Sequence, residues 1–82
     1  MIDPETYVFD PADYETRHPS TVALLRWFEY DHLAGEARVA SQVCHEVAHE
    51  QVRRTPDGPE LTAGLRKLLE AKDCFVRASI EI

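Results

Sequence analysis

The chain has 82 residues, with nine basic and fifteen acidic side chains and a net charge of −6 at pH 7. This length has room for one domain, and a domain of this size buries only about 60% of its unfolded surface. No apolar run reaches the roughly 20 residues of a membrane span, and the first residues lack the basic and apolar parts of a signal peptide. We therefore expect a cytoplasmic protein with no membrane contact.

The acidic charge is concentrated at the N-terminus. Residues 1–16 carry five acidic side chains and no basic one, whereas the rest of the chain carries ten acidic and nine basic side chains. Residues 1–19 contain three prolines and no helical periodicity, which predicts an extended acidic arm before a single helical domain at 20–82. The nearly neutral domain has no broad positive field for long nucleic acid.

The first expected helix covers about residues 21–33. Ser20 precedes an apolar run and is a favourable N-cap. Apolar residues recur at helical spacing through the segment, namely Val22, Leu25, Phe28 and Leu33. We expect the helix to end at Ala34-Gly35.

Two longer helices are expected over about 36–54 and 60–80, separated by the turn TPDGP at 55–59. The first has a stripe of small residues: Ala40, Val43, Cys44, Val47 and Ala48. The second has larger apolar residues that we expect to be buried: Leu61, Leu65, Leu68, Leu69, Phe75, Val76 and Ile80. Each helix is about 30 Å long, and a turn this short makes them an antiparallel hairpin in an all-α fold.

The apolar side chains of residues 60–80 have more surface than the small side chains of residues 36–54 can cover. We therefore expect the protein to be a homo-oligomer. In a reducing cytoplasm, Cys44 and Cys74 are expected to be reduced and separately buried.

The segment His45-Glu46-Val47-Ala48-His49 matches the HExxH motif of zinc hydrolases. His45 and His49 lie on one helical face, Glu46 would be the general base, and the hairpin places Glu70 as a third ligand. Against this, charged and polar residues follow the motif directly, and the chain has no strand to hold a peptide. We keep the zinc hydrolase as the alternative and expect no metal, no cofactor and no enzymatic activity.

A resemblance to a known family covers residues 17–80. The residues that carry it are PDG at 56–58 with ELTAGLRKLLEAKDCFVRASI at 60–80, together with His18-Pro19 and Ala48-His49. They resemble a family of small phage and prophage helical-hairpin proteins that includes anti-CBASS and anti-Thoeris proteins, which sequester cyclic nucleotide signals of bacterial defence. The resemblance implies a hexamer or trimer that binds its ligand between protomers without hydrolysing it. Glu70 stands where these proteins carry an arginine that meets cyclic trinucleotides.

A cyclic nucleotide needs arginine forks for its phosphates and aromatic faces for its bases. Residues with this chemistry gather near the first helix and on the last: Arg17, His18, Arg26, Trp27, Tyr30 and Arg66. We expect these six residues to bind the ligand. A homo-oligomeric protein–protein adaptor remains a third possibility, in which the helix faces serve assembly alone.

Overall fold

The computed structural model describes residues 16–80, which form three α-helices and one short 3-10 turn. The elements are α1 (Pro19–Leu25), η2 (Arg26–Phe28), α2 (Gly35–Arg54) and α3 (Pro59–Ile80). The all-helical fold is therefore confirmed, and the two long helices begin within one residue of their predicted starts. Of the predicted acidic arm, residues 1–15 lie outside the described part, and Pro19 already belongs to α1.

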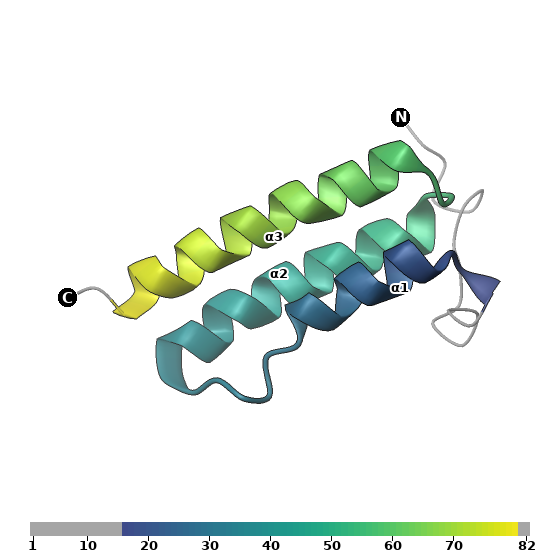
Figure 1. Ribbon diagram of the computed structural model, residues 1–82. Helices are drawn as coiled ribbons and strands as arrows, with labels where there is room; N and C mark the ends of the chain where they lie inside the picture. The colour runs from purple at the N-terminus through teal and green to yellow at the C-terminus, as the bar shows by residue number, and fades with distance from the viewer. Residues whose placement is uncertain (1–15, 81–82) are drawn as a thin grey trace.

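The long helices form the predicted hairpin, and α1 packs across both of them (Figure 1). The turn at 55–58 reverses the chain, because Pro56 and Gly58 disfavour continuation of the helix. Pro59 can then open α3, since the first turn of a helix has amide groups without an internal acceptor. At the other end, Gly35 adopts φ +62°, which a residue without a side chain accepts readily.

The first helix differs from its prediction at both ends. It begins at Pro19, and its cap is His18, whose ring Nδ1 accepts the backbone N–H of Ser20. It ends at Leu25 and continues through the 3-10 turn η2 only to Phe28, instead of reaching residue 33, because side chains from other helices bind the last carbonyl groups of η2. The Lys72 ammonium group donates to the Trp27 carbonyl at 2.6 Å, and the His45 ring bonds to the Phe28 carbonyl at 3.1 Å.

The core lies where α1, η2, α2 and α3 meet. It is centred on buried side chains from all four elements: Leu25, Phe28, Cys44, Ala48, Val52 and Leu65. Leu61, Leu68 and Leu69 are partly buried against this core. The elements are held together by one compact apolar cluster, as the helical periodicity predicts.

Several residues predicted to be buried are exposed. On α2, the predicted stripe divides: Cys44 and Ala48 enter the core, whereas Val43 and Val47 are exposed. On α3, Phe75 and Ile80 are exposed by 57% and 64%, so burial of these two residues was wrongly predicted for this single chain. The physical reason is that α1 covers only one side of the hairpin, so within residues 16–80 no helix packs against the other side.

The two cysteines are both free thiols, as expected, but only Cys44 is buried. Cys74 is exposed, which corrects the prediction of two buried thiols. Burial raises the pKa of the Cys44 thiol, and the nearby Lys72 charge offsets this in part. Within residues 16–80, no helix is both long and apolar enough to cross a lipid bilayer.

Candidate functional site

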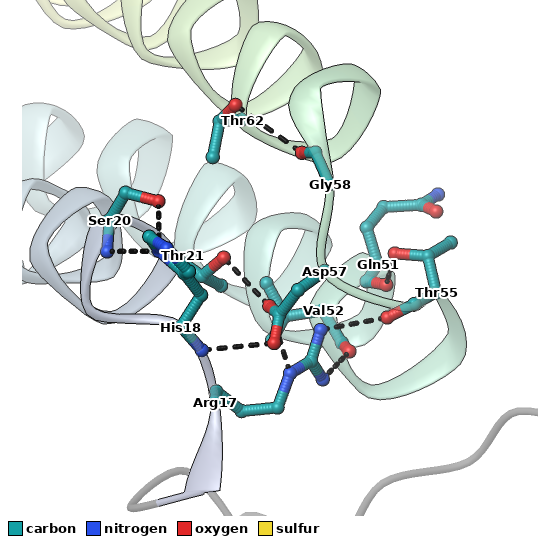
Figure 2. Close-up of polar contacts among 10 residues, drawn as sticks. All are labelled: Arg17, His18, Ser20, Thr21, Gln51, Val52, Thr55, Asp57, Gly58 and Thr62. Carbon is teal, nitrogen blue, oxygen red and sulfur yellow. Dashed lines mark hydrogen bonds and ion pairs between the residues drawn. The ribbon is translucent and has the colours of Figure 1, made fainter.

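Arg17, one of the predicted ligand-binding residues, is held inside the fold. Figure 2 shows its guanidinium group directed at the end of α2 and the turn that follows. It donates to the carbonyls of Val52 and Thr55 at 2.6 and 2.8 Å, and to the Asp57 carboxylate at 3.1 Å. The residue is only 6% exposed. Arg17 therefore fastens the start of the described chain to the hairpin turn.

Asp57 is the centre of this cluster (Figure 2). Its carboxylate accepts the backbone N–H of His18 at 2.9 Å and the hydroxyl of Thr21 at 2.8 Å, besides Arg17. Partial burial raises the pKa of Asp57, but these hydrogen bonds and the Arg17 charge outweigh it and hold that pKa below its usual value. We call the cluster of Arg17, His18, Thr21 and Asp57 the turn clasp.

Arg26 and Trp27 lie on the outer surface of η2. Trp27 is 66% exposed, and both residues border a shallow hollow together with Ala23. An exposed tryptophan side chain with an arginine beside it offers a stacking face and a phosphate-binding fork in one place. Both residues of this predicted pair are accessible on the described surface.

Arg66 is exposed on α3. Ser20 and Thr62 line one hollow between α1 and α3. Arg66 follows Thr62 by about one helical turn, so it lies on nearly the same face of α3 as Thr62. We call the surface of Arg26, Trp27 and Arg66 the α1–α3 edge.

Tyr30 is turned toward α2 and contacts two side chains of that helix. Its ring meets His45 edge to face at 5.0 Å, and the Arg38 guanidinium group lies 5.0 Å from its centre. The six predicted residues are thus divided. Arg17 and His18 belong to the turn clasp, Tyr30 to a contact with α2, and the other three to the α1–α3 edge.

The HExxH residues are on α2, and the structure brings only the two histidines together. The rings of His45 and His49 are 4.2 Å apart between centres. Glu46 is exposed and accepts a hydrogen bond from Gln42. Nowhere in residues 16–80 do three His, Cys, Asp or Glu side chains gather around a possible metal position, so Glu70 does not complete the pair. Burial lowers the pKa of His49, and the neighbouring His45 lowers it further.

In the described part of the chain, the side of the hairpin away from α1 is apolar and is covered by no other helix. Val39, Val43 and Val47 follow one another along α2 at intervals of four residues, and each is exposed by 42% or more. Val47 borders a hollow of about 620 Å³ between the two helices, with Leu61 and Leu68 on its α3 side. We call this surface the open face; a monomeric protein seldom exposes so continuous an apolar surface without a partner.

Two residues of structural weight were not singled out from the sequence. In the sequence, Asp57 belongs to the expected turn at 55–59, and nothing distinguishes Lys72 within the helix expected at 60–80. Lys72 is 8% exposed, and its ammonium group donates to the Trp27 carbonyl. Neither role has a local signal, because the partners lie 36–45 residues away in the sequence.

Comparison of the chain with models of protein families, with curated proteins and with solved structures finds no match.

Proposed function

We propose that this chain is a non-enzymatic, homo-oligomeric binding protein that sequesters a small cyclic nucleotide signal in the cytoplasm of a host cell. The proposal rests on the resemblance across residues 17–80 and on one structural observation. That observation is the exposed Trp27 side chain beside Arg26. The ligand would lie on the α1–α3 edge, which excludes Arg17 from the ligand contacts expected at first.

The chemistry of the α1–α3 edge matches the chemistry of such a ligand. A cyclic nucleotide carries phosphates joined to flat bases, so a binding site needs cations and an aromatic face close together. Arg26 and Arg66 supply guanidinium forks, which bind phosphate through paired hydrogen bonds. Trp27 supplies an aromatic face on which a base can stack. A nucleotide would cover the tryptophan side chain that is now exposed to water.

Replacing either residue of the η2 pair should weaken nucleotide binding. Trp27→Ala removes the stacking face, which is worth about 1–3 kcal/mol per base, and Arg26→Ala removes a charge-assisted contact of about 1.5–3 kcal/mol. Each change corresponds to an affinity loss of roughly five- to 150-fold. The measurement is calorimetry of the wild type and both variants against a panel of cyclic di- and trinucleotides.

Arg77→Ala is the matched control, because Arg77 is an exposed arginine near the far end of α3. It should bind nucleotide as the wild type does. No heat from any nucleotide with the wild type would overturn the proposal. If the wild type and both η2 variants bound nucleotide with equal affinity, the binding site would not be on the α1–α3 edge.

Assembly is the second part of the proposal, and the open face supports it. A second copy of the chain is the expected occupant, because the face is apolar along both helices and 82 residues bury little surface alone. Val43→Glu places a charge in the middle of the valine row, where burying an unpaired charge is costly. We expect the wild type to be larger than 9.4 kDa by light scattering at micromolar concentration, and Val43→Glu to be smaller than the wild type.

Gln42→Glu adds the same charge to α2 at the neighbouring position, outside the valine row, and should leave the assembly unchanged. A wild type of monomeric mass would contradict the assembly. An oligomer that binds no nucleotide would instead favour the adaptor, for which the open face alone is sufficient.

A further inference from the structure

The two histidines of the HExxH segment form a contact that the proposed nucleotide surface does not use. They are four residues apart on α2, and their ring centres are 4.2 Å apart with the ring planes inclined by 39°. Side chains at this spacing lie above one another on one helical face. Two histidines four residues apart on one helical face are also the pair that binds zinc in an HExxH helix.

The His45 ring is oriented by a contact from outside α2. Its Nδ1 lies 3.1 Å from the carbonyl oxygen of Phe28. A carbonyl oxygen can only accept a hydrogen bond, so Nδ1 carries the proton and Nε2 carries the lone pair. A histidine that binds a metal is held in this way, with the second ring nitrogen donating to a carbonyl or carboxylate. The edge contact with Tyr30 at 5.0 Å fixes the ring further.

We propose that His45 and His49 bind one divalent transition-metal ion, of the class of Zn²⁺, Ni²⁺ or Cu²⁺, as a two-nitrogen chelate on α2. Imidazole nitrogen suits these ions, whereas Mg²⁺ and Ca²⁺ require oxygen ligands. The described chain gathers no third His, Cys, Asp or Glu beside the pair, so the remaining coordination positions go to water. The site is therefore an exchangeable one, without the closed ligand set of a structural zinc site.

This inference is independent of the proposed function and assigns no catalysis to the metal. Glu46 is exposed, and its carboxylate accepts a hydrogen bond from the Gln42 side chain. We assign Glu46 no part in metal binding.

The test is a titration of the full chain, with any affinity tag removed, by ZnCl₂, NiCl₂ and MgCl₂ in the absence of nucleotide. The wild type should bind one Zn²⁺ or Ni²⁺ per chain, and either ion should raise its unfolding temperature. It should show no binding of Mg²⁺. His45→Ala and His49→Ala should each weaken binding at least about tenfold. Direct calorimetry at a temperature where each variant is folded separates lost binding from lost stability.

His32→Ala is the matched control, because His32 is exposed in the turn between η2 and α2. It should bind metal as the wild type does. The electron spin resonance spectrum of bound Cu²⁺ should show nitrogen couplings that weaken in either α2 variant. The absence of Zn²⁺ and Ni²⁺ binding, or binding that survives both α2 substitutions, would overturn the proposal. Neither result bears on nucleotide binding, which is measured without metal.

Discussion

Phe28→Ala should lower the free energy of unfolding by about 3–5 kcal/mol, the range for deleting a fully buried aromatic ring. Phe28 has no exposed surface, and it belongs to the core cluster that joins η2 to α2 and α3. Its removal leaves a cavity that helices on three sides cannot collapse to fill. An 82-residue domain has a total stability of only about 4–12 kcal/mol, so the variant is close to unfolding.

Trp27→Ala is the matched comparison, because the two aromatic residues are neighbours in the sequence. The Trp27 side chain is 66% exposed, and the contact with Lys72 uses its backbone carbonyl. Its replacement should therefore change stability by no more than about 0.5 kcal/mol. Urea denaturation at a fixed chain concentration measures both variants. A larger loss for Trp27→Ala than for Phe28→Ala would show that the aromatic residue in the core was misassigned.

Phe28→Leu keeps the Phe28 prediction testable if the alanine variant does not fold. Leucine fills most of the space, so the cost should fall well below that of alanine. If the leucine and alanine variants lost the same stability, the loss would not come from the cavity.

Arg17→Ala should lower the free energy of unfolding by about 3 kcal/mol, since it removes a charged donor from buried carbonyl and carboxylate acceptors. The Arg17 side chain is 4% exposed and that of Asp57 is 30% exposed, so solvent weakens the ion pair only in part. For a domain of this size, the unfolding temperature should fall by roughly 12–24 °C. Thermal unfolding followed by circular dichroism measures the change.

Arg17→Lys separates the charge from the shape of the guanidinium group. Lysine keeps the charge but cannot donate to Val52, Thr55 and Asp57 in one plane, so it should recover only part of the loss. Arg77→Ala, on the exposed surface of α3, should cost no more than about 0.5 kcal/mol. Full stability in Arg17→Lys would mean that charge alone, and not the set of hydrogen bonds, holds the turn clasp.

Acid unfolding gives a second measurement of the same prediction. The pKa of Asp57 is lower in the folded chain than the value of about 3.9 expected when unfolded. The unfolded chain therefore binds the proton first, and stability falls as the pH drops from about 5 through the folded pKa. Asp57→Asn should lower stability at pH 7 and reduce this acid dependence. An unchanged acid dependence in that variant would contradict the role given to Asp57.

The predicted hairpin turn and the predicted starts of the two long helices agree with the structure. The ends of α2 and α3 follow from Gly35 and from the Pro56–Pro59 turn, whose backbone preferences act within a few residues. Local pattern does not separate the six ligand-binding candidates from one another. Arginine and aromatic side chains are equally suitable for a ligand or for the fold, and composition does not distinguish an enclosed Arg17 from an exposed Arg26.

The sequence by itself determined the all-helical hairpin and its turn, because periodicity, proline and glycine act locally. Only the tertiary structure decided that the helical turns after α1 stop at Phe28, since Lys72 and His45 reach the last carbonyls of η2 across 45 and 17 residues. It also decided which aromatic of the Trp27-Phe28 pair is buried, and that Arg17 serves the turn clasp instead of the outer surface. These outcomes depend on how three helices pack together, and contacts between residues far apart in the chain leave no local pattern to interpret.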